Sequence, residues 1–509
     1  MSEDDIRNGG GDAAPEEELT SEQLNEMRLV RREKLKKLQD MGRNPYLNEH
    51  WDIDAYSENI KADFDNMDGR EVSVAGRLMA FRHMGKASFI DIQDDRGRIQ
   101  IYVRQDAITP EEYEIFLTYD IGDIIGAEGV VFKTRHGEVS VKASKVVLLT
   151  KSLQILPNKR QGLKDTELRY RQRYVDLIMN PEVKETFIKR AKIIKEIKRY
   201  LEDDEGFLEV DTPTLTVIAG GANARPFTTH HNTLDIDMNL RISNELYLKR
   251  LTVGGFDRVY EMGKMFRNEG MDRNHNPEYT ALELYRAYGC MEDVMRITEN
   301  LVSCAAMAAT GSMRITYQGK EFDLTPPWER LTMQEAVKKW VGVDFDTIET
   351  DEQARAFAKK HLSEGSETMT RGLAIVALFE EYCEQYLTGP IFITGHPVEI
   401  SPLAKRDPAD PRITRRFEAY VNTWEIANGF SELNDPIDQY RRFKEQQTML
   451  EAGDDEAHPM DEDFVNALEV GLPPTGGLGI GVDRVITLIT DSPSIRDIIL
   501  FPTMKPLEE

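Results

Sequence analysis

The chain has 509 residues, with 90 Asp and Glu against 64 Lys and Arg, and its formal net charge is −26. This length allows about three domains, and the acidic balance excludes a uniformly basic nucleic-acid binder, although not a local basic patch. Three scattered cysteines without a CxxC pair exclude a disulfide framework and a cysteine zinc site. Because we find neither an apolar run of about 20 residues nor a signal peptide, we expect a cytoplasmic protein without a membrane span.

The N-terminal residues fall into two parts. Residues 1–19 are rich in Gly, Asp and Glu, and we expect a disordered acidic tail there. Thr20 and Gln23 match a capping box that opens a helix to about Met41, within a basic region at 20–64. Such a charge run is either a solvated helix face or a contact for an RNA backbone, and both interpretations stay open. The basic residues of this helix are Arg28, Arg31, Arg32, Lys34, Lys36 and Lys37.

Residues 65–150 alternate as short strands do. We expect strands near 72–79, 87–93, 98–103, 124–133 and 138–149, with a helix near 110–119. Three strands, a helix and two strands is the order of a five-stranded barrel of the OB type. Such barrels bind single-stranded nucleic acid by stacking bases on aromatic rings beside a positive groove. Arg77, Phe89 and Gln100 on three consecutive strands could supply a cation, a ring and an amide, although the strand pattern alone favours Phe89 in the core.

The remainder, after a linker expected at 151–180, predicts a large α+β domain at 181–509. Its strands and helices alternate without a regular parallel rhythm. A helix presents Phe187, Ala191, Ile194 and Leu201 on one apolar face. Pro213 then suits a sheet edge or an interface with another chain, because proline cannot donate within a ladder.

Several common sites are absent from the sequence. No Gly-Lys pair is followed by Ser or Thr, and no HExxH or GxSxG occurs. The glycines at 476, 477, 479 and 481 do not fit a dinucleotide fingerprint. His230 and His231 would point to opposite faces of a strand, so they do not predict a metal site.

Paired charges remain in four segments, at 241–250, 266–285, 418–432 and 477–484. Arg267 and Arg484 could each clamp a phosphate or a carboxylate. Glu418 and Glu425 are carboxylates of the kind that hold Mg²⁺ together with substrate phosphates. Each pair alone is more often a structural ion pair. Together they indicate nucleotide-phosphate chemistry outside the P-loop class.

From about residue 20 onward the chain resembles the bacterial-type lysyl-tRNA synthetases, a family of class II aminoacyl-tRNA synthetases. Residues 206–213 are similar to the first class motif, 266–269 with 275–279 to the second, and 477–484 to the third. The runs 220–227 and 428–434 resemble the lysine branch. The chain departs from the family at Asp272-Arg273-Asn274 before His275, and at Thr423-Trp424 before Glu425.

The resemblance implies an α+β protein: an OB-type anticodon-binding barrel followed by a class II antiparallel sheet of the seven-stranded type, flanked by helices. It implies a homodimer and an inserted segment near 333–370. The implied activity is the ATP-dependent attachment of L-lysine to tRNA(Lys) through a lysyl-adenylate, with Mg²⁺ as cofactor and with release of AMP and pyrophosphate. Two alternatives are lysylation of a non-tRNA acceptor and an inactive synthetase-like RNA-binding module.

The resemblance also implies roles for individual residues. The catalytic residues would be Arg267, Glu269, His275 and Arg484. ATP would be bound by Arg267, Glu269, His275, Asn276, Tyr279, Glu418 and Arg484, and Mg²⁺ by Glu418 and Glu425. Lysine would be bound by Gly221, Glu245, Arg267, Glu283, Tyr285, Asn428, Phe430 and Glu432. The anticodon would be read by Arg77, Phe89 and Gln100, which makes Phe89 a stacking ring and no longer a core residue, while the basic helix would contact the tRNA backbone.

Overall fold

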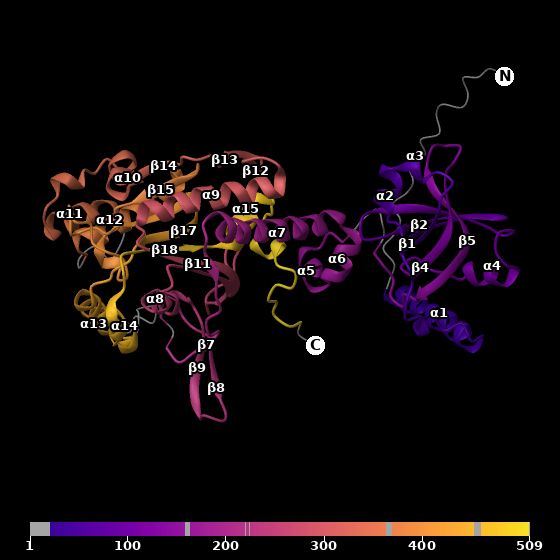
Figure 1. Ribbon diagram of the computed structural model, residues 1–509, viewed down its shortest axis with the longest axis horizontal. Helices are drawn as coiled ribbons and strands as arrows, with labels where there is room; N and C mark the ends of the chain where they lie inside the picture. The colour runs from indigo at the N-terminus through magenta and orange to yellow at the C-terminus, as the bar shows by residue number, and fades with distance from the viewer. Residues whose placement is uncertain are drawn as a thin grey trace, which may run out of the picture. The chain divides into compact units, whose positions relative to one another are not determined.

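The computed structural model describes residues 21–157, 163–218, 220–222, 224–362, 369–451 and 460–507. The expected acidic tail at 1–19 and Thr20 of the expected capping box lie outside these residues. The chain forms two units, 1–162 and 163–509, which run from indigo to violet and from magenta to yellow in Figure 1. Within the described ranges, no helix is both long and apolar enough to cross a membrane.

The first unit contains a closed barrel with the strand order β1-β2-β3-β5-β4. Its elements are α1 (Ser21–Asp40), α2 (Ser57–Ala62), α3 (Phe64–Met67), β1 (Glu71–Met84), β2 (Ala87–Gln93), β3 (Arg98–Arg104), α4 (Pro110–Phe116), β4 (Ile124–Lys133) and β5 (Val139–Thr150). Alternate residues such as Ile90, Ile92, Ile99 and Ile101 point into a buried core, as the period of two predicts. The parallel pairing of β3 with β5 closes the barrel, and the predicted OB fold is confirmed.

Helix α1 is attached to the barrel by part of its basic run. Arg31 is 6% exposed and donates to the carbonyl oxygens of Ser152, Gln154 and Ile121. Lys34 forms an ion pair with Asp120 at 2.7 Å. These two cations therefore hold the helix in place, whereas Arg32, Lys36 and Lys37 remain exposed.

The second unit is built on an eight-stranded sheet, one strand more than expected. In order the strands are β14 (Glu329–Thr332), β15 (Ile391–Thr394), β16 (Arg416–Val421), β17 (Trp424–Ser431), β18 (Thr475–Ile480), β11 (Glu278–Ala287), β10 (Arg258–Phe266) and β6 (Leu208–Glu209). The six middle strands are antiparallel, and the end strands β14 and β6 each pair in parallel with their neighbour. Pro213 follows the edge strand β6 and lies outside any strand.

Helices surround this sheet, and two small sheets accompany it. The helices are α5 (Thr166–Arg171), α6 (Arg173–Met179), α7 (Pro181–Arg199), α8 (Glu245–Val253), α9 (Met291–Thr310), α10 (Met333–Trp340), α11 (Asp351–His361), α12 (Arg371–Tyr382), α13 (Pro436–Glu451), α14 (Glu462–Gly471) and α15 (Val482–Ile489). The small sheets are β7 (Leu215–Thr216) with β9 (Ile236–Leu240) and β8 (Thr228–His231), and β12 (Arg314–Tyr317) with β13 (Lys320–Asp323).

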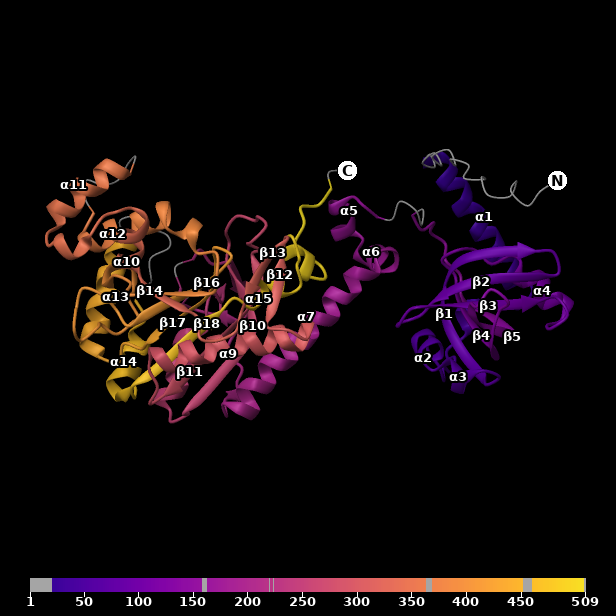
Figure 2. The ribbon, with the colours of Figure 1, turned by 90° about the horizontal axis from the view of Figure 1, so that it is seen from above.

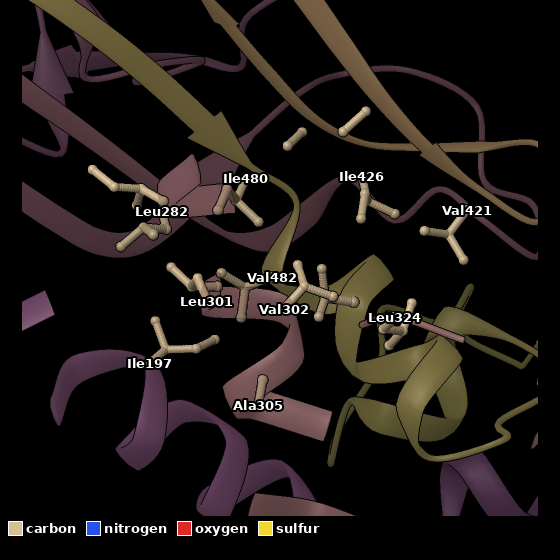
Figure 3. Close-up of a cluster of buried hydrophobic side chains, with 14 of the residues drawn as sticks. Ile197, Leu282, Leu301, Val302, Ala305, Leu324, Val421, Ile426, Ile480 and Val482 are labelled. Atoms are coloured by element: carbon tan, nitrogen blue, oxygen red, sulfur yellow. The ribbon is translucent and has the colours of Figure 1, made fainter. Parts of the chain in front are cut away.

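The main core lies between one face of the sheet and helices α7, α9 and α15. Figures 1 and 2 show α7 and α9 side by side along the sheet. Figure 3 shows Leu282, Ile426 and Ile480 from three strands facing Ile197 of α7 and Val302 of α9. The buried face of α7 runs through Val183, Ile193 and Ile197, and continues to Leu201 in the π-helical turn beyond it. Ala191, which we expected on this face, is exposed.

The segment 151–180, expected to be a linker, is packed structure from α5 onward. Arg173 is fully buried, pairs with Asp176 at 2.5 Å and donates to the carbonyl oxygen of Leu500 at 3.0 Å. This arginine therefore ties α6 to the C-terminal segment. In the expected insertion at 333–370, α10 and α11 pack with α12 around a core of their own, and residues 363–368 lie outside the described ranges.

Candidate active site

A cavity of about 380 Å³ opens on the second unit's sheet. The residues of β11 and β18 that reach it, such as Glu283 and Gly477, alternate with residues of the main core. Of the substrate- and metal-binding residues predicted from the sequence for this unit, all but Glu418 and Glu432 line the cavity. Those that do are Gly221, Glu245, Arg267, Glu269, His275, Asn276, Tyr279, Glu283, Tyr285, Glu425, Asn428, Phe430 and Arg484.

Two glycines of β18 form the floor of the cavity. Gly477 lies between Tyr285 of β11 and Phe430 of β17, and Gly479 lies between Glu283 and Asn428. A Cβ atom on Gly477 would stand 1.8 Å from Oε1 of Glu432 and 2.8 Å from the Tyr285 ring. The missing side chain therefore makes room for the acid and the ring beside it.

One end of the cavity is acidic. Glu283 accepts hydrogen bonds from Ser243 Oγ at 2.8 Å and from the Tyr285 hydroxyl at 3.2 Å. Burial and the nearby charge of Glu245 raise the pKa of Glu283 to about 7. Glu432 is fully buried, its Oε1 has no hydrogen-bond partner, and burial raises its pKa well above the usual range. This end of the cavity therefore has more negative charge than the surrounding residues neutralise.

Lys249 of α8 is the cation that the structure adds to this acidic end. Its ammonium is fully buried and pairs with Glu245 Oε1 at 2.5 Å and with Glu432. Although burial acts to lower the pKa of Lys249, these two carboxylates raise it. The residue is in the first charged segment, but no sequence pattern distinguished it from the neighbouring surface cations.

The opposite end of the cavity presents donors and an aromatic ring. The guanidinium of Arg267 lies 5.5 Å from the centre of the Tyr279 ring, and its buried Nε has no hydrogen-bond partner. Asn276 is 7% exposed, and its buried Oδ1 also lacks a partner. A buried donor and a buried acceptor left unpaired in this way suit a polar ligand that supplies both. Glu269 is exposed at the rim.

His275 is held between two charged residues. Arg484 donates from Nη2 to Nε2 of His275 at 3.1 Å, and Asp272 Oδ2 lies 2.8 Å from Nδ1. Burial opposes the ionisation of Asp272, but the hydrogen bonds from His275 and Asn274 lower its pKa. The departure from the family at 272–274 thus places an acceptor beneath the imidazole.

The second departure lies away from the cavity. Asn422 and Thr423 have positive φ values of 53° and 63° and form the turn between β16 and β17. Trp424 packs edge-on against Tyr317, with the ring centres 5.4 Å apart. Neither Thr423 nor Trp424 lines the cavity.

Glu418 and Glu425 differ in their surroundings. Glu418 accepts hydrogen bonds from Arg416 at 2.6 Å and from the Tyr420 hydroxyl at 2.7 Å. Glu425 lines the cavity, where desolvation and the charge of Glu418 raise its pKa. In the described part of the chain, no group of three or more His, Cys, Asp or Glu residues is arranged to hold a metal. Two mutually repelling carboxylates nevertheless fit a divalent cation that takes its other ligands from phosphates and water.

The barrel carries a second candidate site. Phe89 is half-buried and stacks on Tyr102 of the next strand, with the ring centres 4.8 Å apart, and Phe132 of β4 follows at 5.9 Å from Tyr102. Gln100 accepts a hydrogen bond from Ser140, and Arg77 donates to the carbonyl oxygen of Gly122 at 2.7 Å. By strand register the three expected residues lie on one face, with Arg77 opposite Gln93 and Phe89 opposite Tyr102.

Sequence reasoning missed Lys249, Asp272 and the rings that extend Phe89. Tyr102 is two positions after Gln100 on the same strand, so the period of two could have identified it. Asp272 precedes His275 by three residues, a common turn spacing. Lys249 follows Glu245 at helical i,i+4 spacing, which predicts their contact but not its burial.

Comparisons with known proteins match both units. A family model described as tRNA synthetases class II (D, K and N) matches residues 165–505, and one described as an OB-fold nucleic acid binding domain matches 72–149. A protein named lysine–tRNA ligase from Thermoanaerobacter pseudethanolicus is 58% identical over 486 residues, which cover 96% of this chain and 97% of the relative. Proteins of the same name from Moorella thermoacetica and Syntrophomonas wolfei are 55% and 52% identical to this chain. The matched regions cover 95% of this chain in both cases, and 99% and 98% of the two relatives.

Proposed function

Since the chain belongs to the class II tRNA synthetases, and among them to the lysine–tRNA ligases, we propose that its cavity joins L-lysine to ATP and passes the lysyl group to tRNA(Lys). The reaction forms lysyl-adenylate and pyrophosphate, and the transfer then releases AMP. The observation that carries this proposal is the charge separation along the cavity. Carboxylates gather at one end, and an arginine with unpaired donor capacity lies towards the other.

In the first step the carboxylate of lysine attacks the α-phosphorus of ATP. The substrate supplies its own nucleophile, already deprotonated, so the protein contributes positioning and charge stabilisation. We assign Arg267 to the lysine carboxylate and the α-phosphate, because its buried Nε has no protein partner. A guanidinium in this position offsets the negative charge that develops on the phosphate oxygens.

The remaining ATP contacts follow from the polar end of the cavity. Tyr279 and Arg484 would enclose the adenine, and Asn276 would accept from its amino group through the unpaired Oδ1. His275 would reach the terminal phosphates from the rim, beside Glu269.

The acidic end would select lysine by its two ammonium groups. Glu245, next to Gly221, would pair with the α-ammonium, and Glu283, Tyr285 and Glu432 with the ε-ammonium. Glu432 does not line the cavity, but its unpaired Oε1 occupies the space beside Gly477 where a Cβ atom would otherwise stand. Asn428 and Phe430 would shape the passage between the two ends. An uncharged side chain would leave these buried acids without a partner, which is costly.

We further propose that Mg²⁺ binds at Glu418 and Glu425. The repulsion between these two carboxylates supports a cation there. When bound, Mg²⁺ would neutralise phosphate charge and favour departure of pyrophosphate. Glu425 would also help to keep Arg484 in place, since that side chain donates to its carbonyl oxygen at 2.6 Å.

The barrel at 65–150 would bind the anticodon of tRNA(Lys). Phe89 offers a half-exposed ring for stacking, and Gln100 and Arg77 lie on the same face for hydrogen bonds to bases. The exposed cations of α1, Arg32, Lys36 and Lys37, would contact the tRNA backbone. Use of tRNA in translation supports a cytoplasmic location.

A homodimer is proposed for the second unit. The edge strand β6 and the segment after it expose apolar side chains, which would be covered in a dimer. They are Leu208, Leu215, Val217 and Ile218. Measurement of the mass in solution by light scattering tests this, and Leu208→Asp should yield monomers.

Two alternative functions make different predictions. A ligase for a non-tRNA acceptor would have no need of the nucleic-acid-binding barrel. An inactive RNA-binding module would have no need of a cavity with both charged ends intact. The barrel and the complete cavity therefore support tRNA lysylation over both.

The test is ATP–pyrophosphate exchange with each amino acid in turn, with Mg²⁺ and without tRNA. We expect exchange with lysine alone. Exchange with another amino acid would overturn the pocket assignment, and no exchange from folded protein would favour the RNA-binding module. Charging of tRNA(Lys) in a second assay then separates the tRNA ligase from a ligase for another acceptor.

A further inference from the structure

Lys249 is fully buried beside the acidic end of the cavity, between two carboxylates and three aromatic rings. Its side chain is 0% exposed, and its ammonium joins Glu245 on its own helix to Glu432 after β17. The rings of Phe430, Phe464 and Tyr285 lie 5.4, 5.8 and 5.9 Å from its nitrogen. Glu245 and Glu283 line the cavity whereas Lys249 does not, so a ligand there would meet these two carboxylates before the lysine ammonium.

The formal charges of the four charged side chains at this end sum to minus two. Glu245, Glu283 and Glu432 contribute three negative charges, and Lys249 contributes one positive charge. With all three acids ionised the protein thus presents a formal charge of minus two, and the α- and ε-ammonium groups of lysine carry plus two. The substrate's own carboxylate lies towards Arg267 at the other end of the cavity.

We propose that Lys249 is a built-in counter-ion that sets the pocket to the charge of a dicationic amino acid, and thereby acts as a positioning residue for specificity. This inference rests on the proposed lysine site. Glu245 is proposed to pair with the α-ammonium of the substrate and Glu432 with its ε-ammonium. By bridging these two acids, the Lys249 ammonium also keeps them at a constant separation.

A purely structural role does not account for this arrangement. Burying an ammonium and two carboxylates costs more than packing an apolar side chain of the same length, so stability alone would favour Met or Leu at position 249. A bridging cation has a function when a ligand brings further positive charges to the same carboxylates, because it then sets how much charge the ligand must supply. The raised pKa values of Glu283 and Glu432 agree with a pocket that lacks positive charge until the ligand binds.

The counter-ion role predicts that charge can be rebalanced by a second substitution. Glu432→Gln alone leaves the pocket at minus one, and we expect the KM for lysine to rise about a hundredfold, since a charged hydrogen bond is lost. Lys249→Met alone leaves it at minus three, so Glu245 and Glu432 repel each other and bind a proton that lysine must displace. The double variant returns to minus two.

The experiment is lysine-dependent ATP–pyrophosphate exchange with the wild-type protein, both single variants and the double variant. We expect the double variant to have a KM for lysine at least about tenfold lower than that of Glu432→Gln, the coupling expected of charges in contact. The KM for ATP should stay constant across the series. Lys338→Met removes a surface ion pair with Asp344 and serves as the matched control, with an unchanged KM for lysine.

Additive losses in the double variant would overturn the inference, because they would make Lys249 a packing residue only. If the wild-type protein does not exchange with lysine, the proposed function fails instead, so the two failures are distinguishable. If Lys249→Met unfolds but the double variant folds and exchanges, the charge balance is supported.

A measurement on the wild-type protein covers the case in which no Lys249 variant folds. The titratable groups that face this end are Glu245, Lys249, Glu283, Tyr285 and Glu432. Calorimetric titration with lysine at pH 7.5, in two buffers of different ionisation enthalpy, counts the protons exchanged. We expect less than one proton to be released per lysine bound, because with Lys249 in place the pocket is already close to minus two at this pH. Release of one proton or more per lysine would overturn the inference, because the pocket would then lack the charge that Lys249 is proposed to set.

Discussion

Arg484 donates to Nε2 of His275 at 3.1 Å, although 209 residues separate them in the chain. A guanidinium can only donate, so Nε2 must accept, and the ring proton is on Nδ1, facing Asp272. Arg484, in the segment that resembles the third class motif, therefore determines the tautomer of His275, in the segment that resembles the second. In the proposed reaction, His275 is already oriented at the rim before ATP arrives.

Asp272→Asn should weaken ATP binding through this tautomer. The amide can still accept from the backbone of residues 274 and 275, but its nitrogen cannot accept from Nδ1 of His275. Imidazole with its proton on Nε2 would then oppose Arg484. We expect the KM for ATP to rise by up to about tenfold, the value of one hydrogen bond, with the KM for lysine unchanged. Asp323→Asn, at a turn far from the cavity, is the control; an equal rise in both KM values would contradict the prediction.

The stabilisation of the protein by lysine should depend on pH. The pKa of Glu283, raised to about 7, means that the folded protein holds a proton that the unfolded chain releases above about pH 4.5. The stability that this group contributes without ligand is complete below that pH and is lost as pH rises through 7. Lysine pairs with the ionised form, so its Tm increase should grow from pH 6 to pH 8.

Thermal denaturation with and without saturating lysine measures this. Glu283→Gln should flatten the pH dependence of the lysine-induced shift. Glu384→Gln removes another carboxyl with a pKa raised to about 7 by burial, outside the lysine pocket, and should leave that dependence in place. A shift of equal size at pH 6 and pH 8 would be inconsistent with the role of Glu283.

Phe89→Ala should separate tRNA binding from amino-acid activation. Loss of one stacked base costs about 1–3 kcal/mol, so we expect the KM for tRNA(Lys) to rise about tenfold to a hundredfold. ATP–pyrophosphate exchange should be unaffected, because the ring is in the barrel and the cavity is in the second unit. Phe501→Ala removes an exposed ring of the second unit and should change neither measurement. An equal loss of exchange activity would count against an anticodon role.

Arg173→Met should destabilise the second unit without altering its chemistry. The substitution leaves Asp176 buried with Arg169, at 2.8 Å, as its one remaining ionic partner among the described residues, and it removes the donor to Leu500. Breaking a buried ion pair costs about 3–5 kcal/mol. Urea denaturation should show a loss of this size, while KM values at low temperature stay constant. Arg171→Met breaks an exposed pair with Glu167 and should cost much less.

Local pattern was enough to predict the barrel, and the resemblance to the family's motifs identified most of the residues around the cavity. Four of the five barrel strands were predicted to within one residue at each end, because one buried face imposes a period of two on the sequence, whereas β1 continues five residues beyond the predicted end. The glycines at 477 and 479 and the charged segments could be identified because each is contiguous in the chain. The residues proposed to meet the ligand are also the ones whose chemistry is recognisable one motif at a time.

Tertiary structure decided the features that depend on distant partners. The parallel end strands β6 and β14 are two and four residues long, too short for a periodic signal. Arg173 in the expected linker becomes buried only because the C-terminal segment folds over it. Lys249 looks in the sequence like any helical lysine, and it becomes a counter-ion because Glu432, which follows β17 far along the chain, packs against it. Sequence periodicity reports which face of an element is buried, but the partner across that face is set by packing between segments that are distant in the chain.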